Sequence, residues 1–391
     1  MIQKAKTTKI AFISLLAAIF LATAGGFFVF GDRAQAKSSV TKWQKKLEQS
    51  GIDPALWQKC LPKVSRSEYL RVLKLAAGGG VQPSTDSGSL GPEIAVGLWY
   101  FEKSEIKDDP FKIDANKDYN IRKSDGGEII ATVSASLTTR VTYTEDGNLK
   151  VYSSIPDRIV GGEIWFDAAD GNNSDLIFDA HRPGDDYDNF RGKIIMNYYH
   201  GDDIYHGSTT QVSQIWVINK LPIEQYVWGM GETTGTGPTD HVRVMTTIFR
   251  TYGDWYIQNA TKYKPLGFKI RSDSGSQIYG GYDWEKDHPH IKEAADDTRG
   301  RIISYKGDPV LAAYCSWTDG KTRNYPDRKN YPYLKSVKDP YGKKKGLKPG
   351  QAGNHMWGLS ANGALGYAKH GKSWTWILKH YYSKTAISSA Y

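Results

Sequence analysis

The sequence predicts an α+β fold, with a β-rich first half followed by a region of mixed helix and strand. Between residues 93 and 223, short apolar or alternating runs are separated by turn signals such as Asp146-Gly147, which is the pattern of strands joined by tight turns. After this stretch, apolar residues recur at helical spacing before strand-like runs return. A chain of 391 residues is long enough for two domains with a sizeable core.

The N-terminal segment, residues 1–36, predicts a membrane anchor. Three lysines precede an uncharged run over residues 10–30, which is long enough to span a bilayer and longer than the apolar core of a typical signal peptide. The basic flank places the N-terminus in the cytoplasm and the rest of the chain outside. Ala34-Gln35-Ala36 resembles a cleavage site, so secretion after removal of a signal peptide is the alternative. Both interpretations predict an extracytoplasmic body.

Residues 37–77 predict a small helical module. Val40, Trp43 and Leu47 fall on one helical face, and Gly51 is a natural helix stop. Residues 78–92 are rich in Gly, Ser and Pro, which is the composition of a flexible linker. The remaining domain therefore covers residues 93–391, with a β-rich part at 93–218 and a mixed core at 219–391. Its first strands are expected at residues 93–101, 119–124, 128–137, 140–145, 149–154, 191–199 and 213–223.

Composition narrows the partners without identifying one. Aromatic residues make up 13% of the chain, with 12 Trp and 25 Tyr, which suits a carbohydrate-handling surface as well as an ordinary β core. The formal net charge of +9 favours acidic partners such as an anionic cell wall or membrane surface. We predict no nucleic-acid partner, because the basic residues are scattered among 42 acids and no nucleic-acid motif is present.

No metal or cofactor is predicted. Asp114, Asn116 and Asp118 match the first ligand positions of an EF-hand loop, but the turn glycine and the bidentate glutamate are missing, so a polar turn is the preferred interpretation. Cys60 and Cys315 lie in different segments, and nothing in the sequence brings them together as a disulfide or a metal site.

The most informative stretch is residues 221–252, where one isolated carboxylate, Glu232, stands among glycines and threonines. A helix is predicted directly after it, with Thr239 or Asp240 as its N-cap. A lone acid at such a place is either a catalytic acid or a partner for unpaired N–H groups of the helix. The apolar stripe of that helix consists of Val242, Met245, Phe249, Tyr252 and Tyr256.

This stretch resembles the core signature of the stage II sporulation protein D / amidase-enhancer family. Three further blocks resemble the family's later motifs in the same order, at residues 297–322, 354–365 and 374–387, and the similarity extends from about Gly91 to the end. The positions of the first block that fall in register are Leu221, Pro222, Glu224, Tyr226, Gly229, Glu232, Pro238, Arg250, Thr251 and Tyr252.

The resemblance implies an activity on bacterial peptidoglycan. One branch of the family cleaves peptide-free glycan strands as a lytic transglycosylase, and the other is named for enhancing an amidase. An ordinary glycosidase needs two carboxylates, whereas a lytic transglycosylase needs one, because the C6 hydroxyl of muramic acid is the nucleophile. Glu232 maps to the family's catalytic glutamate. The residues expected to contact substrate are Arg250, Tyr252, Ser316, Thr318, His355 and Ser360.

Several of these assignments have a structural alternative. Arg250 is expected either to orient Glu232 or a substrate oxygen, or to form a structural ion pair with Asp254 or Glu232. His355 is expected either to line the groove or to serve as a hydrogen-bonded structural histidine. For Glu232 itself, apolar burial would raise the carboxyl pKa as a general acid requires, while a helix N-terminus would lower it. The walls expected around this carboxyl are Tyr226, Trp228 and Met230.

The sequence also departs from the family pattern. Met356-Trp357 stands where the family has Gly-Val, and Ala361-Asn362 where it has Gln-Tyr. The prediction is therefore a lytic transglycosylase acting on peptidoglycan, with a non-catalytic, glycan-binding enhancer of a cell-wall amidase as the alternative. A purely structural envelope protein is the third hypothesis. A catalyst requires Glu232, whereas a glycan binder tolerates its replacement by glutamine.

Overall fold

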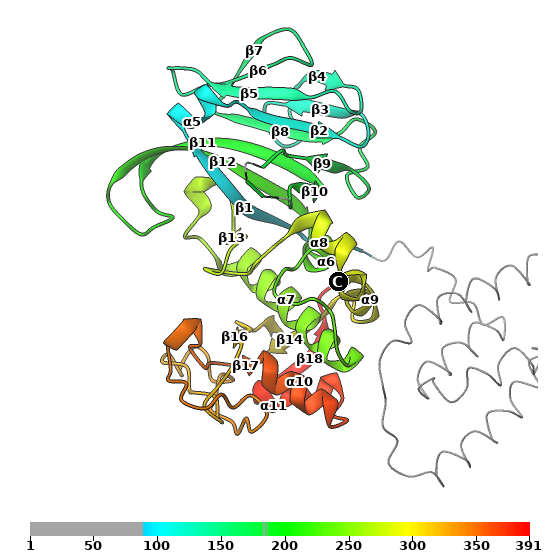
Figure 1. Ribbon diagram of the computed structural model, residues 1–391, viewed down its shortest axis with the longest axis vertical. Helices are drawn as coiled ribbons and strands as arrows, with labels where there is room; N and C mark the ends of the chain where they lie inside the picture. Colours follow the sequence, from blue (N-terminus) through cyan, green and yellow to red (C-terminus); the bar gives the residue numbers. More distant parts are fainter. Residues whose placement is uncertain (1–88, 183, 186) are drawn as a thin grey trace, which may run out of the picture. The chain divides into compact units, whose positions relative to one another are not determined.

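The computed structural model describes residues 89–391, apart from residues 183 and 186. The predicted anchor, the helical module and most of the linker lie outside the described residues, as does Cys60. Over the described residues, none of the helices combines the length and the apolar character needed to cross a membrane. Mixed sheets and helices confirm the predicted α+β class for this part of the chain (Figure 1).

The larger sheet has seven strands and holds the entrance to the mixed core. Its neighbours are antiparallel, except for a short parallel pair between the first two strands. The order is β13 (Ile270–Arg271), β1 (Glu93–Glu102), β12 (Gln211–Pro222), β11 (Lys193–Asp202), β8 (Glu163–Ala168), β3 (Tyr119–Arg122) and β4 (Ile129–Val133).

The second sheet has six antiparallel strands and packs on the first to form a sandwich (Figure 1). Phe178 lies between the sheets, with ring centroids 5.4 Å from Tyr119 and 6.2 Å from Phe166. The short helix α5 (Lys103–Asp108) follows β1. The order of the second sheet is β10 (Asn189–Arg191), β9 (Ile177–Asp179), β2 (Phe111–Ala115), β5 (Thr139–Tyr143), β6 (Leu149–Tyr152) and β7 (Arg158–Gly161).

The long strand β12 carries the chain from the sandwich into the mixed core. Successive side chains of a strand point to opposite faces, so Ile215 and Val217 join the core between the sheets while Trp216 and Ile218 form a second apolar cluster on the other face. Phe268 closes that second cluster, with its ring 4.9 Å from Trp216. β12 ends at Pro222, close to the predicted boundary at residue 219.

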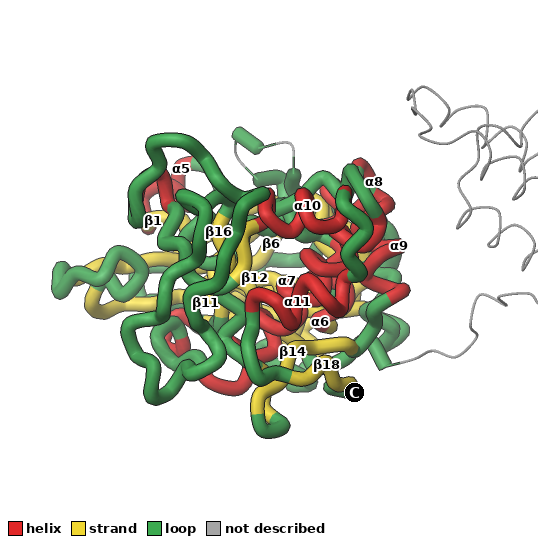
Figure 2. Tube along the Cα trace, turned by 90° about the horizontal axis from the view of Figure 1, so that it is seen from below, coloured by secondary structure: helices red, strands yellow, loops and turns green. Residues whose placement is uncertain are grey.

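The C-terminal half contains helices, two small sheets and long loops. In Figure 2 the helices α8, α9 and α10 gather on one side and loops cover the other. Its helices are α6 (Ile223–Trp228), α7 (Thr239–Asn259), α8 (Gly281–Asp287), α9 (Pro289–Asp297), α10 (Ala361–Lys369) and α11 (Trp374–Tyr381), with 3-10 turns η2 (Lys264–Leu266) and η3 (Gln351–Gly353). Its strands are β14 (Arg301–Tyr305), β15 (Asp308–Pro309) and β18 (Ala386–Ser389) in one sheet, and β16 (Tyr314–Cys315) with β17 (Leu359–Ser360) in the other.

Helix α7 is the centre of this half, since α6, α9, α10, α11 and β14 all pack against it. The predicted stripe is buried or half-buried, as expected. The opposite face, including Val244 and Ile248, is buried too, because α7 is covered on several sides. The predicted N-cap is wrong, because the helix begins at Thr239 and the residue before it is an extended Pro238. The Pro238 carbonyl accepts the N–H groups of His241 and Val242. Asp240 then lies in the first turn, where a negative charge is favourable.

All the predicted early strands are present, although their ends differ by a few residues. Of the residues that resemble a calcium loop, Asp114 lies in the strand β2 rather than in a turn, with Oδ2 2.8 Å from His181 Nε2, and the Asp118 carboxylate accepts the backbone N–H of Ala135 at 2.8 Å. Cys315 is buried with a free thiol.

Candidate active site

A short pairing of two backbone segments positions Glu232. The Gly231 N–H donates to the Ile278 carbonyl at 2.8 Å, and the Gly280 N–H donates to the Gly229 carbonyl at 2.9 Å. A Cβ atom at Gly229 would lie 2.5 Å from the carbonyl oxygen of Gly281, closer than real Cβ contacts. Glycine is therefore required for the segments to approach, and the approach places Glu232 beside the chain at Ile278.

The Glu232 carboxyl group is half-buried and has two hydrogen-bond partners. The backbone N–H of Ile278 donates to Oε1 at 2.9 Å, and the Tyr314 hydroxyl is the second partner. Burial raises the pKa of Glu232 above its ordinary value, and the two hydrogen bonds offset this only in part. Burial is the largest influence on this pKa and sets the direction of the shift, as a general acid requires.

A buried chain of hydrogen bonds orients the second partner. The Tyr226 hydroxyl donates to Oε1 of Gln277 at 3.0 Å, and Nε2 of Gln277 donates to the Tyr314 hydroxyl oxygen at 3.3 Å. Since Gln277 supplies a proton to that oxygen, the Tyr314 hydrogen is free to donate to Glu232. Tyr226 and Gln277 are fully buried, so their packing holds this arrangement in place.

Of the three residues expected to surround this carboxyl group, Tyr226 supports Glu232 indirectly. It does so through the hydrogen-bond relay that leads from Tyr226 by way of Gln277 to Tyr314. Trp228 and Met230 are buried as well, but their described contacts lead elsewhere. The Lys292 ammonium lies 4.1 Å from the Trp228 ring, and Met230 pairs with Tyr279 in a backbone bridge.

Tyr252 belongs to the same site. Its ring lies 6.3 Å from that of Tyr314 and stacks on Tyr256 at 4.6 Å, and its hydroxyl donates to the Tyr256 hydroxyl at 2.9 Å. Burial raises the pKa of Tyr252, and nearby groups including the Glu232 carboxylate raise it further. The structure therefore places Tyr252 next to Tyr314, the hydrogen-bond partner of Glu232.

His355 supports the strand that carries Tyr314. The Trp357 N–H donates to His355 Nδ1 at 2.9 Å, so the ring proton is on Nε2, and the backbone of Tyr314 is the other partner. The ring stacks on Trp357 with centroids 4.9 Å apart. Burial lowers the pKa of His355, and the Tyr314 bond offsets this in part, so the neutral ring is favoured. This geometry matches the hydrogen-bonded structural role.

The Arg250 side chain pairs with Glu224 rather than with Glu232 or Asp254, so the roles expected for it there and toward substrate were wrong. Its side chain is fully buried and forms a bidentate pair with Glu224, through Nε to Oε1 at 2.8 Å and Nη2 to Oε2 at 2.7 Å. It also donates to the carbonyls of Arg301 and Ala295. A guanidinium enclosed in this way has no route to a sugar, so Arg250 ties α7 to α6, α9 and β14.

Two of the expected sugar contacts are also structural. Thr318 is fully buried and donates its hydroxyl to Asp339 at 2.7 Å. Ser360 is the buried N-cap of α10, and its Oγ accepts the Gly363 N–H at 3.1 Å. Hydroxyl side chains are favoured in turns and caps for this reason. Ser316, the remaining serine among the expected sugar contacts, is exposed.

One departure from the family pattern has a backbone consequence. Met356 has φ of 62°, in the left-handed region that favours glycine, the residue of the family pattern at this position. Its side chain is fully buried, and Trp357 beside it packs on Tyr325 with ring centroids 4.9 Å apart. The chain therefore keeps the turn and adds apolar packing to it.

The sequence did not identify the groups that hold Glu232. Tyr314 lies within the motif block at residues 297–322 but is not among the positions expected to contact substrate, and Gln277 and Ile278 lie in a Ser/Gly-rich loop without a motif. Its place in that block was the only signal for Tyr314.

Comparisons with known proteins confirm the family resemblance. Residues 211–305, which include Glu232, match the family model described as stage II sporulation protein. Stage II sporulation protein D of Bacillus subtilis (strain 168) is 27% identical over 141 residues, which cover 32% of this chain and 41% of that protein. The amidase enhancer of the same strain is 31% identical over 104 residues, covering 25% and 13%. The chain thus spans less than half the length of either relative.

Proposed function

We propose, on the premise that this chain belongs to the stage II sporulation protein D / amidase-enhancer family, that it cleaves peptidoglycan glycan strands as a lytic transglycosylase. The observation that carries the proposal is the Glu232 carboxyl group, half-buried with a raised pKa and held by the Ile278 N–H and the Tyr314 hydroxyl. One carboxylate is sufficient for this reaction, because the C6 hydroxyl of the muramic unit is the nucleophile.

In the proposed reaction, protonated Glu232 donates its proton to the glycosidic oxygen while the bond from that oxygen to C1 of the muramic unit breaks. The C6 hydroxyl of the same unit attacks C1, and the Glu232 carboxylate accepts the hydroxyl proton. The products are a 1,6-anhydromuramic end and a new hydroxyl on the leaving sugar, and the acid is regenerated without water. Tyr314 stabilises the intermediate carboxylate, and its relay keeps Glu232 in position between the two proton transfers.

The experiment supplies the purified chain with peptide-free glycan strands and analyses the products by mass spectrometry. We expect 1,6-anhydromuramic ends from the wild type and a loss of about 10²–10⁴-fold in rate for Glu232→Gln. Glu128→Gln is the matched control, because that side chain is exposed and, among residues 89–391 as described, pairs with Lys123 alone. Products with a reducing muramic end, or full activity of Glu232→Gln, would refute the assignment.

A second function, a non-catalytic enhancer of a cell-wall amidase, is favoured by the 31% identity to a protein of that name. In this case Glu232 only contributes to glycan binding. Glycan binding without any cleavage by the wild type, together with faster cleavage by an added amidase, would establish the enhancer in place of the transglycosylase. Either function acts on the wall, so we further propose that residues 10–30 anchor the body outside the cytoplasm, which fractionation of cells into membrane and medium checks.

A further inference from the structure

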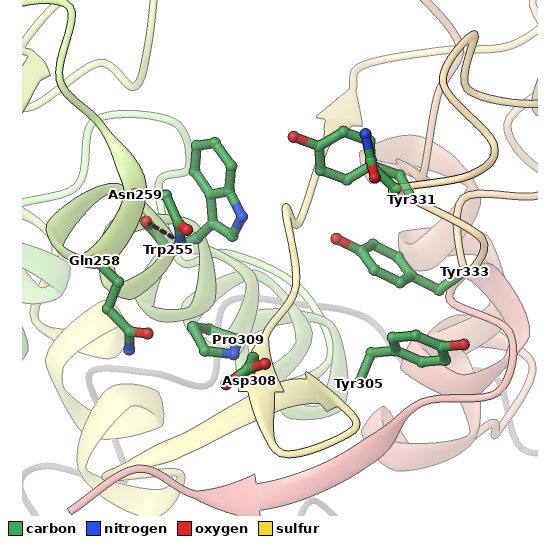
Figure 3. Close-up of a pocket in the computed structure, with 9 residues that line it drawn as sticks. Trp255, Gln258, Asn259, Tyr305, Asp308, Pro309, Tyr331 and Tyr333 are labelled. Atoms are coloured by element: carbon green, nitrogen blue, oxygen red, sulfur yellow. Dashed lines mark hydrogen bonds between the residues drawn. The ribbon is translucent and has the colours of Figure 1, made fainter.

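A pocket of about 480 Å³ lies at the C-terminal end of α7, away from the residues assigned above. Figure 3 shows Trp255, Gln258 and Asn259 of α7 on one side and three tyrosines on the other, with the turn between β14 and β15 at the base. This volume is in the range of small-ligand sites. The lining residues are Trp255, Gln258, Asn259, Tyr305, Asp308, Pro309, Asn330, Tyr331 and Tyr333.

Four aromatic side chains line the pocket. Tyr333 lies at the centre of the tyrosine side, with ring centroids 5.5 Å from Tyr305 and 6.2 Å from Tyr331, and Trp255 stands opposite (Figure 3). Aromatic side chains bury a large apolar area while their polar ends remain available for hydrogen bonds. A flat ligand with apolar faces and a polar edge, such as a pyranose ring, matches this lining.

The polar lining favours a ligand rich in hydroxyl or amide groups. Within the described part of the chain, the hydroxyls of Tyr305 and Tyr331 and the carboxylate of Asp308 form no hydrogen bond. The Asn259 side chain donates from Nδ2 to the Trp255 carbonyl at 2.9 Å, which leaves its own carbonyl oxygen available. These donors and acceptors line one pocket, where Asp308 and Asn259 are exposed and the two tyrosines are half-buried, so a ligand can hydrogen-bond with them in place of water.

The charge of the lining discriminates between the two sugars of peptidoglycan. Asp308 is the one charged residue among the nine, and none of the nine is Lys, Arg or His. Lys306 lies next to the Tyr305 ring, with Nζ 5.5 Å from the ring centroid, but it is not part of the pocket lining. The lactyl carboxylate of a peptide-free muramic unit would be repelled by Asp308, whereas N-acetylglucosamine carries no charge.

A row of rings connects the pocket to Glu232. Trp255 contacts Tyr256 at 5.2 Å, Tyr256 stacks on Tyr252 at 4.6 Å, and Tyr252 lies 6.3 Å from Tyr314, the hydrogen-bond partner of Glu232. Contacts between rings therefore lead from one wall of the pocket to the hydrogen-bond partner of Glu232, which is the direction that a bound glycan strand would take.

We infer that this pocket is a subsite for an uncharged N-acetylglucosamine unit of the glycan strand, and that Asp308 excludes the muramic unit from it. The inference rests on the proposed function in taking the ligand to be a cell-wall glycan. It sets the register of the strand, because the two sugars alternate: a fixed N-acetylglucosamine position determines which linkage reaches Glu232.

The test measures binding of an N-acetylated chitotetraose by calorimetry to chain carrying Glu232→Gln, so the result does not depend on cleavage. In this background we expect Trp255→Ala and Tyr331→Ala to weaken binding by about 10-fold or more. Trp376→Ala is the matched control, since Trp376 lies on α11 and is 40% exposed. Unchanged binding by both pocket variants, or no binding by the parent, would overturn the subsite.

A second variant tests the charge and leaves the core intact. Asp308 is exposed, so Asp308→Lys should fold normally and shift preference from chitotetraose toward peptide-free muramic fragments, by about 10-fold in the ratio of affinities. An unchanged ratio would refute the role of Asp308. A wild-type chain that fails to cleave any glycan, together with both effects in the Glu232→Gln background, would remove the transglycosylase proposal and leave the subsite established.

Discussion

Replacing Arg250 tests whether this residue acts on the fold or on the substrate. In Arg250→Met, the Glu224 carboxylate remains fully buried with the Gly300 N–H at 2.8 Å and the Tyr391 hydroxyl at 2.6 Å, but without a cation. Leaving one member of a buried ion pair unpaired costs about 3–5 kcal/mol. Total stabilities are about 5–15 kcal/mol, so the variant should lose a large part of its free energy of unfolding.

The same pair offers a compensating variant and a control. Glu224→Leu combined with Arg250→Met removes the unpaired charge and should recover about 1 kcal/mol, since the Gly300 N–H and the Tyr391 hydroxyl then lose their acceptor. Arg243 lies on the same helix and pairs with Asp297 at 2.8 Å at the surface. Arg243→Met should therefore cost about 1 kcal/mol or less.

Guanidinium unfolding followed by circular dichroism and by tryptophan fluorescence measures these differences as shifts in midpoint at constant slope. Glycan binding is measured in parallel on the folded fraction, where we expect Arg250→Met to bind like the wild type. A variant that is as stable as the wild type but has lost glycan affinity would refute the structural assignment and restore Arg250 to the substrate site.

Three further predictions follow from single contacts. Burial lowers the pKa of His241 to about 4, and neither ring nitrogen has a partner of normal hydrogen-bond geometry. The unfolded chain binds a proton at His241 that the native state does not bind, so the free energy of unfolding should fall by about 3 kcal/mol as the pH drops from about 6.5 to 4. Unfolding titrations of His241→Phe should lack this loss of stability. Tyr314→Phe removes a bond that lowers the pKa of Glu232, so the alkaline limb of the pH–rate profile, where the acid loses its proton, should move to higher pH; an unmoved limb contradicts the relay. Thr318→Val should cost about 1–3 kcal/mol in thermal unfolding by leaving Asp339 short of a donor, without a change in glycan affinity.

Local pattern was sufficient for much of the fold and for one candidate catalytic residue. Alternating apolar residues predict strands because side chains of a strand point to alternate faces, and the observed β1, β11 and β12 follow that pattern. The stripe along α7 was predicted for the same kind of reason. Glu232 was identified because it belongs to a motif of residues that are close in sequence, and such a motif can be recognised without knowledge of the fold.

Hydroxyl and charged residues were assigned less well, since their sequence context does not show whether a side chain meets solvent or another part of the chain. Thr318 and Ser360 belong to motif blocks, yet one hydrogen-bonds a buried carboxylate and the other caps a helix. Arg250 is separated from Glu224 by more than six helical turns of sequence, and nothing local distinguishes that partner from Asp254.

By itself, the sequence determined the α+β class, the strand pattern, the helix after residue 238, and Glu232 as the family's catalytic position. Only the tertiary structure decided that burial outweighs the hydrogen bonds on Glu232, that Tyr314 and Gln277 hold it, and that Trp255 and Tyr331 face one pocket. The physical reason is distance along the chain. Periodicity and motifs depend on near neighbours, whereas desolvation, hydrogen-bond relays and pockets arise from side chains that folding brings together.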